Sequence, residues 1–529
     1  MPESVRSSMD WHQLWRRKPI ETLAEEAIPE HLRLRRALGA RQLVFLGVGA
    51  IVGAGIFSTA GTAAAGGEHH LGAGPALVVS FLLVAVACAL AGLCYAELAA
   101  LAPVSGSAYT YAYATLGELA AWIIGWDLIL EYAIGNVAVA ISWSDYFQSL
   151  LASLGGSWPA WLGTDYRSAA AAAGELADCV ARGMEVSALP ALTQHKAAAL
   201  VEAPRLWGVP VVFNLPAVLI VAGITWVLVR GIRESSAFNT GMVLVKLAVI
   251  GLFVAVGAWY VEPEHWREFA PNGWKGITHA AAIVFFAYIG FDAVSTAAEE
   301  TRDPQRNLPR GILGSLLVCT LIYVAVALVL TGMVRWDRLS HVADPLAMAF
   351  EERGIGWARG LMAFGAVVAT ASVLLVFQLG QPRIFFSMAR DGLLPAWAAR
   401  VHPRYRTPHV TTVLTGVAVA GVAAVTHIDE MVELCNIGTL FAFLLVAAGV
   451  LVLRWKEPDR PRPFRTPWVP WVPLGAIVTC AWLMLQLPVR TWVRFGLWLG
   501  AGLLIYMLYG RRRSRWGAAR GASAASLGS

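Results

Sequence analysis

The sequence GVGAIVGAGIFSTAG, from Gly47 to Gly61, concentrates glycine inside the first long apolar run of the chain. Each glycine costs a helix interior roughly 1 kcal/mol relative to alanine, so the pattern needs a reason. One interpretation is close packing, since small residues let transmembrane helices approach one another. The other is a helix broken at Gly53-Ala54-Gly55, which must line a polar cavity because lipid cannot satisfy the freed backbone groups. The restarted half-helix would offer free N–H groups and about half a positive charge to a carboxylate.

The composition indicates a membrane protein. Of 529 residues, 57% are hydrophobic and 14% are charged, whereas soluble domains carry about 25% charge. Apolar stretches near the roughly 20 residues that a membrane helix needs occur twelve times: 42–64, 75–100, 118–150, 211–230, 237–260, 276–298, 311–333, 358–386, 410–427, 432–454, 470–488 and 493–510. The sequence therefore predicts an all-α protein of twelve transmembrane helices, with one membrane domain over 42–510.

Basic residues predict the orientation of these helices. If the N-terminus is cytoplasmic, the inward connections carry Arg230, Arg233, Arg302, Arg306, Arg310, Arg390, Arg400, Arg404, Arg406, Arg454, Lys456, Arg460, Arg462 and Arg465. This distribution follows the positive-inside rule and predicts cytoplasmic tails at 1–41, with room for a short surface helix, and 511–529. The connection 153–209 then faces outward and can hold one or two short helices. The net charge of +6 sets orientation and implies no nucleic-acid partner.

The sixth apolar stretch contains a second interruption. In AIVFFAYIGFDAVSTAAEETRDPQRNLPRG, residues 282–311, Gly290 and Asp292 interrupt the apolar run. Transporters built from inverted repeats place a broken helix at equivalent positions of their two halves, with the substrate between them. Carbonyls freed near Phe286 and Ala287 would accept from an ammonium group. Two breaks, one donating and one accepting, predict a site for an α-amino acid.

Five strings carry a family resemblance: GAIVGAGIF, CYAELAALAPVSGSAYTYAY, GWDLILEYAIG, FFAYIGFDAVSTAAEETRDPQRNLPRGI and GQPRIFFSMARDGLLP. They resemble the cationic amino acid transporter branch of the amino acid–polyamine–organocation superfamily, in its bacterial form, over about residues 40–510. The resemblance implies a five-plus-five inverted repeat with broken first and sixth helices, plus two additional helices. It also implies a multi-pass permease of the cell membrane that imports amino acids with protons. The implied substrate-binding residues are Val52, Gly53, Ala54, Gly55, Ile56, Phe286, Ala287 and Ile289.

Lys246 is an isolated cation about two turns into the fifth stretch, with no acid within four residues on its own helix. The resemblance places it where sodium-dependent relatives hold a cation between the first, fifth and eighth spans. A lysine there would bond the carbonyls of the broken first span. Burial favours a neutral amine, so the hypothesis is that Lys246 couples transport to protons. The alternative is a structural lysine that extends to the interface.

Asp127 and Glu131 stand four residues apart, on one face of the third span. The resemblance places Glu131 at the substrate cavity, where it would meet the amino group or a polar side chain of the substrate. A structural hydrogen bond to another span is the alternative. Two carboxylates on one face also permit acid–base catalysis, but no nucleophile or metal motif accompanies them. We therefore expect no catalytic residues, no metal and no cofactor.

Phe377 lies in the eighth span, where the resemblance puts it beside the substrate side chain. A phenyl ring there would favour small or medium neutral amino acids, although Glu131 would favour a cationic one. The alternative to a role of Phe377 in substrate selection is a structural one, as a core or lipid-facing side chain. Arg383 either serves the inner gate or extends its side chain to water. The side chains of Glu97, Glu299 and Glu300, near predicted cytoplasmic helix ends, could reach water in the same way.

The predicted function is proton-coupled import of L-amino acids by alternating access, with small or medium neutral substrates preferred and a broad range left open. The partners are the substrate, the proton and the lipid bilayer. The alternatives are a cationic amino acid transporter and a proton-independent exchanger. More distant alternatives are an amino acid sensor and a membrane-embedded enzyme that uses Asp127 and Glu131.

Overall fold

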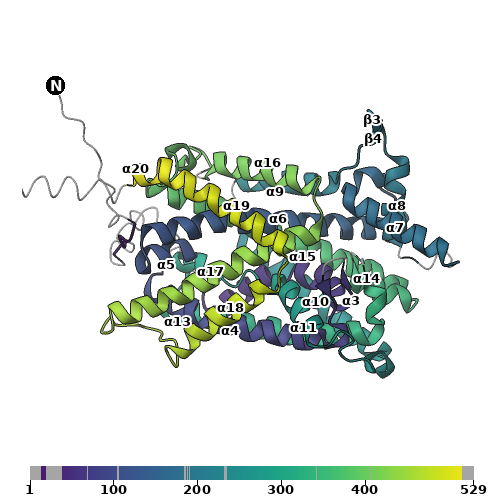
Figure 1. Cartoon of the computed structure of the whole chain (residues 1–529), viewed down its shortest axis with the longest axis horizontal. Helices are drawn as coiled ribbons and strands as arrows, with labels where there is room; N and C mark the ends of the chain where they lie inside the picture. The colour runs from purple at the N-terminus through teal and green to yellow at the C-terminus, as the bar shows by residue number, and fades with distance from the viewer. Residues whose placement is uncertain are drawn as a thin grey trace, which may run out of the picture.

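The computed structural model describes residues 14–19, 38–67, 70–103, 107–183, 186, 189, 191–230, 235–340, 342, 344–405 and 407–514. This part of the chain is mostly helical, and its long helices run along the longest axis of the molecule (Figure 1). Its strands form two small hairpins, β1 with β2 and β3 with β4: Gly66–Gly67, His70–Leu71, Arg205–Leu206 and Val209–Pro210. The surface helix expected in the N-terminal tail has most of its sequence outside the described residues.

Within the described residues, eight helical segments are long and apolar enough to cross a membrane, and a bent helix pair makes a ninth. These segments coincide wholly or in part with α2 (Ala40–Ile51) and α3 (Ala60–Ala65), α4 (Leu77–Leu101), α6 (Glu118–Ser153), α10 (Ser235–Gly257), α11 (Gly273–Val284), α13 (Pro304–Met333), α15 (Gly356–Arg390), α17 (Ile428–Lys456) and α19 (Val489–Ile505). Three shorter apolar helices occupy the fourth, ninth and eleventh predicted stretches: α9 (Leu215–Arg230), α16 (His409–Ala423) and α18 (Trp471–Leu485). The chain is a multi-pass membrane protein, and the count of twelve spans stays a prediction.

Several connections contain helices of their own. The connection after α4 holds α5 (Ser107–Thr115), and the one after α13 holds α14 (Pro345–Glu352). The insert 153–209 holds two helices packed against each other, α7 (Tyr166–Ala181) and α8 (Ala191–Glu202). Asp165 caps α7, since its Oδ1 accepts from the backbone N–H groups of Arg167 and Ser168 at 2.9 and 3.0 Å.

The core is one continuous apolar cluster that joins the long helices. At its centre α6 and α15 lie against each other, and α17 packs on α6. The insert has a separate small cluster of its own around Ala160, Ala169 and Ala199. The insert therefore packs as a distinct unit at one end of α6, which Figure 1 shows at the end opposite to α20 (Arg511–Arg513).

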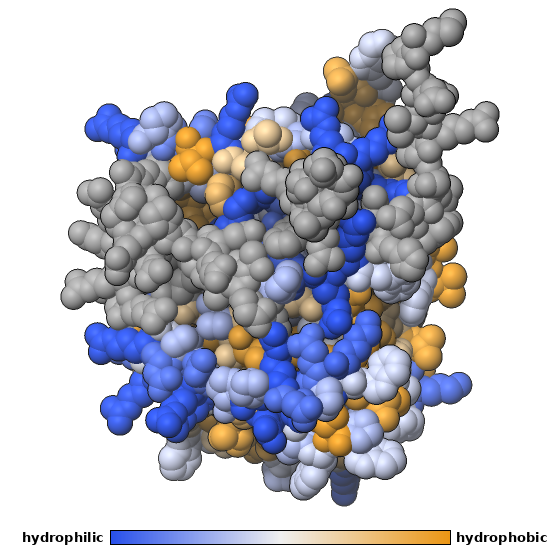
Figure 2. Space-filling model, turned by 90° about the vertical axis from the view of Figure 1, so that its left-hand side faces the viewer, coloured by the Kyte–Doolittle hydropathy of each residue, from blue (hydrophilic) through white to orange (hydrophobic). Residues whose placement is uncertain are grey.

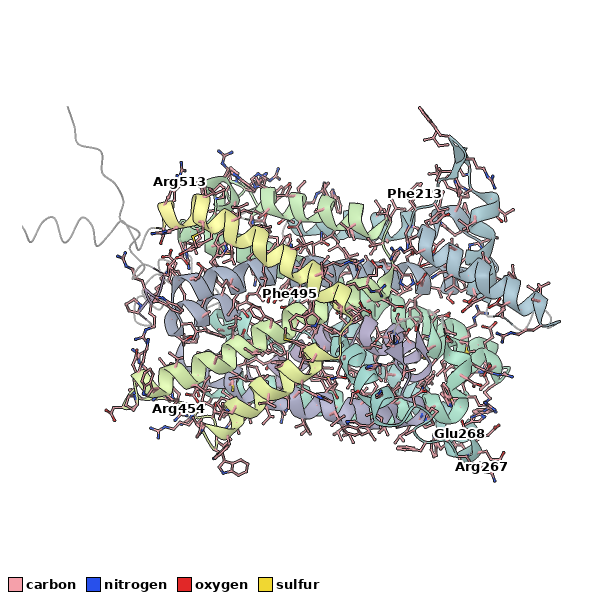
Figure 3. All side chains as sticks on the ribbon, in the orientation of Figure 1. Phe213, Arg267, Glu268, Arg454, Phe495 and Arg513 are labelled. Carbon is pink, nitrogen blue, oxygen red and sulfur yellow. The ribbon has the colours of Figure 1, made fainter. Side chains whose placement is uncertain are left out.

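Both terminal segments meet at the α20 end of the bundle. The backbone N–H of Glu118 donates to the Arg16 carbonyl at 3.0 Å, and Ser514 Oγ donates to Glu118 Oε2 at 2.6 Å. Arg454 and Arg513 lie at this end, whereas Phe213, Arg267 and Glu268 lie at the other (Figure 3). Figure 2 looks onto the first end, where hydrophilic residues gather among the described part of the surface.

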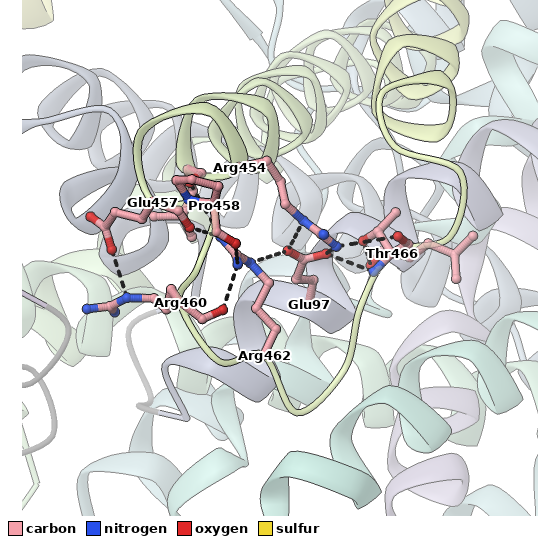
Figure 4. Close-up of polar contacts among 9 residues, drawn as sticks. Glu97, Arg454, Glu457, Pro458, Arg460, Arg462 and Thr466 are labelled. Atoms are coloured by element: carbon pink, nitrogen blue, oxygen red, sulfur yellow. Dashed lines mark hydrogen bonds and ion pairs between the residues drawn. The ribbon is translucent and has the colours of Figure 1, made fainter.

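Glu97 corrects one expectation from the sequence. Its side chain is fully buried, and Arg454 donates to both carboxylate oxygens at 2.9 Å (Figure 4). The backbone N–H of Thr466 donates to it at 2.8 Å, and Arg462 Nε lies 3.2 Å from Oε1. The expectation that the Glu97 side chain reaches water at the end of its helix is therefore wrong. The carboxylate ties α4 to the connection between α17 and α18.

Candidate functional site

The first span is broken where its glycines gather. Helix α2 ends at Ile51, a π-helical turn begins at Gly55, and the two halves are bent by 44°. Val52 between them has an extended backbone, with φ −76° and ψ 104°. A straight helix packed through small residues is therefore not what these glycines form.

Two side chains from other spans bond the carbonyls at the end of α2. Lys246 Nζ on α10 donates to the carbonyls of Gly49 at 2.5 Å and Val52 at 2.8 Å. Tyr323 Oη on α13 donates to the Ile51 carbonyl at 3.1 Å. Lys246 is fully buried, so its side chain does not extend to water. Both donors replace helix hydrogen bonds that the break removes.

The sixth span is also broken, next to the break in the first span. Helix α11 ends at Val284, a 3₁₀ turn follows over Phe285–Tyr288, and Ile289 is extended with φ −62° and ψ 137°. Gly290 then has φ +118°, a conformation that glycine adopts without the strain that a side chain imposes. Helix α12 (Ala293–Thr296) continues the span. The sequence therefore located this second interruption correctly at Gly290.

The two breaks touch, and glycine makes their approach possible. A Cβ added to Gly55 would overlap the Ala287 backbone, and one added to Gly290 would lie 2.9 Å from the carbonyl carbon of Ala50. Tyr323 Oη also lies 2.7 Å from the Ala287 carbonyl. A phenol has one proton, so this hydroxyl is shared between the carbonyls of the two breaks.

Acidic side chains on α6 and the sixth span surround the same region. Asp127 and Glu131 are 0% and 3% exposed, and a Cβ on Gly438 of α17 would lie 2.8 Å from Asp127 Oδ1. Among the described residues, neither carboxylate oxygen of Asp127 has a hydrogen-bond partner, nor has Glu131 Oε2. Tyr132 Oη donates to Asp292 Oδ2 at 3.2 Å. The Tyr132–Asp292 bond thus links α6 to the sixth span two residues after Gly290.

With this geometry in place, comparison with known proteins identifies the family. The amino acid permease family matches residues 38–508. The chain belongs to this family. It is 44% identical to a methylthioribose transporter of Bacillus subtilis over 501 residues, which cover 95% of this chain and 98% of the relative. It is also 44% identical to a branched-chain amino acid permease of the same organism over 503 residues, with the same shares covered.

A more distant relative is a chloroplastic cationic amino acid transporter of Arabidopsis thaliana, which is 36% identical over 455 residues, covering 85% of this chain and 72% of the relative. All three relatives are named as transporters or permeases. The protein is accordingly a membrane permease of this family and not an enzyme. Asp127 and Glu131 need no catalytic explanation.

Phe377 on α15 packs against α6. Its ring centroid lies 5.6 Å from that of Tyr132, and a Cβ on Gly135 would lie 2.9 Å from its Cε2. The side chain is 5% exposed, so the lipid-facing alternative is wrong. Arg383 lies half-buried farther along the same helix, and its gating role stays a prediction.

The other candidate residues are closed off from solvent. Val52, Ala54, Ile56, Phe286, Ala287 and Ile289 are each 5% exposed or less. The carbonyl of Phe286 accepts from the backbone N–H of Ile289 at 3.4 Å. The residues around the two breaks are therefore buried.

The sequence reasoning missed two side chains that hold the breaks, Tyr323 and Asn436. Asn436 Nδ2 on α17 donates to the Ala282 carbonyl at 2.7 Å, just before the sixth-span break. Tyr323 lies within a long apolar run, and Asn436 lies near the start of another, three residues after Glu433. Polar residues inside membrane spans usually face the bundle interior, and that rule could have selected both.

Proposed function

We propose that the protein imports small and medium neutral L-amino acids together with protons by alternating access. The proposed fold has twelve spans, with two inverted repeats of five and two additional helices. Nine span candidates and three shorter apolar helices in the described residues support this count. The breaks in the first and sixth spans would then occupy equivalent positions of the two repeats.

The observation that carries the proposal is the contact between the two breaks. Backbone N–H groups at Gly53–Gly55 would bind the substrate carboxylate, because the restarted half-helix carries a partial positive charge. The carbonyls of Phe286 and Ala287 would accept from the ammonium group. The Ala287 carbonyl has two lone pairs, so its bond from Tyr323 leaves a second acceptor site. Glu131 would complete the ammonium side.

We assign proton coupling to Lys246. A charged ammonium has three N–H donors and a neutral amine has two, so either form can hold the carbonyls of Gly49 and Val52. Loss of the proton changes the charge at the break without removing both bonds. The bundle would then respond to proton release by moving the first span relative to the rest.

The proposed substrate class follows from the shape around Phe377. The ring fills the space between Tyr132 and Gly135, which leaves less room for a long cationic side chain. One relative is named for branched-chain amino acids and another for cationic ones. Apolar pockets discriminate only about 1–3 kcal/mol per methylene, so we expect a graded preference among neutral substrates.

We propose that the end of the bundle carrying Arg454 and Arg513 is cytoplasmic. Arg454, Arg513 and the two terminal segments lie there, in agreement with the positive-inside rule. The insert with α7 and α8 then lies outside the cell membrane. Labelling of single cysteines placed at Arg513 and in α7, in intact cells, would test this orientation.

The decisive experiment is counterflow in proteoliposomes that contain the purified protein. Preloaded alanine or valine should drive uptake of labelled alanine, while arginine and methylthioribose should compete weakly. Stronger competition by arginine than by valine would favour the cationic amino acid transporter. A dominant effect of methylthioribose would favour a sugar-like substrate. Binding without counterflow would favour the sensor.

A further inference from the structure

The insert forms the roof of a cavity that has no assigned role. The cavity is partly open and has a volume of about 80 Å³, and we call it the roof cavity. It is lined by Ser58, Thr59, Asp145, Ala171, Lys196 and Asp429, among others. These residues come from the restarted half of the first span, from α6, from the insert helices α7 and α8, and from the start of α17. The roof cavity therefore lies between the insert and the transport domain.

An ion pair crosses the roof cavity from the insert to the membrane domain. Lys196 Nζ on α8 lies 2.7 Å from Asp145 Oδ1 on α6, and the two side chains are 13% and 3% exposed. Helix α7 is held separately, because Arg167 pairs with Glu430 on α17. These two ion pairs hold the insert to the membrane domain, and of the two only the Lys196–Asp145 pair lines the cavity.

The floor of the roof cavity is continuous with the first-span break. Thr59 Oγ1 donates to the Gly55 carbonyl at 2.5 Å, and Ser58 Oγ lies 2.5 Å from Ser142 Oγ on α6. Both residues belong to the helical turn that begins at Gly55. A molecule in the roof cavity would sit one helical turn from the proposed central site.

We propose that the roof cavity is a second binding site, which captures a small zwitterionic amino acid before it enters the central site. This inference rests on the proposed amino acid function. Lys196 would bind the carboxylate and Asp145 the ammonium group. A buried charge that loses its partner is costly, but a zwitterion supplies the opposite charge to both members of the pair at once. An ion pair at the entrance can therefore open for this ligand class with both charges still compensated.

The size of the roof cavity selects among amino acids. One water molecule needs roughly 10–15 Å³ of such space, so about 80 Å³ accommodates five to eight non-hydrogen atoms. Alanine fits this range, and arginine exceeds it. The remaining groups that line the cavity include the carboxylates of Glu175 and Asp429, which add negative charge beside the proposed ammonium site, and the ring of His427, whose Nδ1 lies 3.8 Å from Asp429 Oδ2.

Equilibrium dialysis with labelled alanine tests the number of sites. The purified wild-type protein should bind two alanine molecules, and Lys196→Met combined with Asp145→Asn should bind one. The double variant removes both charges together, so neither is left unpaired. Lys196→Arg should keep two sites, because it keeps the cation. One site in the wild type, or two in the double variant, would overturn the proposal.

Cysteine protection tests where the second alanine binds. The six native cysteines are buried, so a thiol reagent should report Ala171→Cys, which lines the roof cavity. Ala170→Cys, exposed on the same helix, is the matched control. At an alanine concentration of ten times Kd the unoccupied fraction falls about elevenfold. Labelling of Ala171→Cys should slow accordingly, and labelling of Ala170→Cys should not.

The same protection experiment in a Gly55→Leu background separates the two proposals. Protection of Ala171→Cys that persists there, and that disappears with Lys196→Met and Asp145→Asn, supports the roof cavity as a site of its own. Protection that needs an intact Gly55 would reduce it to a movement caused by central binding and overturn the inference. Absence of alanine counterflow in the wild type would instead overturn the proposed function.

Discussion

Replacing Lys246 by glutamine should separate transport from its proton gradient. Lys246 Nζ bonds the carbonyls of Gly49 and Val52 at the first-span break. A glutamine amide keeps two N–H donors but cannot release a proton at physiological pH. Lys246→Ala would instead leave two buried carbonyls without donors, which costs about 1–3 kcal/mol of folding free energy for each carbonyl. We therefore expect Lys246→Ala to lose about 2–6 kcal/mol of folding stability and Lys246→Gln considerably less.

The magnitude of the transport effect follows from one lysine carrying one proton. A gradient of one pH unit is worth about 1.4 kcal/mol for each proton, which is a tenfold concentration ratio. With the membrane potential clamped at zero and the interior alkaline by one unit, wild-type proteoliposomes should accumulate alanine about tenfold. Lys246→Gln should equilibrate alanine without accumulation, while counterflow persists. Lys275→Gln, a change at an exposed lysine on α11, should behave like the wild type.

The result that would refute this reasoning is accumulation by Lys246→Gln equal to that of the wild type. Loss of both accumulation and counterflow would mean that the lysine is needed for folding or binding, and a thermal unfolding scan of the purified variant would decide which. The proposal requires that Lys246→Gln loses accumulation but keeps counterflow.

Four further predictions follow from particular contacts. Gly55→Leu should reduce alanine binding in dialysis to the roof-cavity site alone while the protein still purifies as a folded species, because its side chain would meet the Ala287 backbone; retention of both binding sites would return these glycines to a packing role. Phe377→Ser should extend the range of counterflow competitors toward arginine or lysine without loss of alanine, and a wild type that already prefers arginine would contradict this. Glu97→Gln should lower the thermal midpoint in detergent, because Arg454 loses a charged partner and buried pairs broken on one side cost about 3–5 kcal/mol; an unchanged midpoint would argue against the cluster. Burial raises the pKa of Asp344, which lies outside the spans, to about 6. The folded state therefore binds this proton more tightly than the unfolded chain, so the free energy of unfolding should fall as pH rises from about 4 to 6. Asp344→Asn should remove that component of the pH dependence in a series of unfolding measurements.

The features that the sequence predicted share a local cause. Glycines at Gly53, Gly55 and Gly290 are unfavourable in a membrane helix, and that local cost points to a break wherever it is found. Helix α7 of the insert likewise forms from local signals, namely the Asp165 cap and the alanine-rich run after it. Such features depend on a few neighbouring residues, so a single sequence is enough to find them.

The features that the sequence did not predict depend on distant partners. Glu97 is paired with Arg454 and Arg462, which lie more than 350 positions away, and no local rule connects them. Helix α5 begins after a connection rich in small and polar residues, where apolar periodicity is weak. Tyr323 could have been selected as an isolated polar residue, but its acceptors could not, because they are backbone carbonyls that become available only when two other helices break.

The donors at the two breaks differ in whether they can change charge. Tyr323 shares its hydroxyl between the Ile51 and Ala287 carbonyls, and a phenol is neutral at physiological pH, so this link between the breaks holds in every protonation state. Within the described part of the chain, Lys246 bonds only first-span carbonyls, and its charge depends on the proton. In the proposed mechanism, a change in that charge acts most strongly on the first break, whose carbonyls Lys246 bonds. The contact between Gly290 and Ala50 would then transmit movement of the first span to the sixth, which is how one proton could act on both halves of the substrate site.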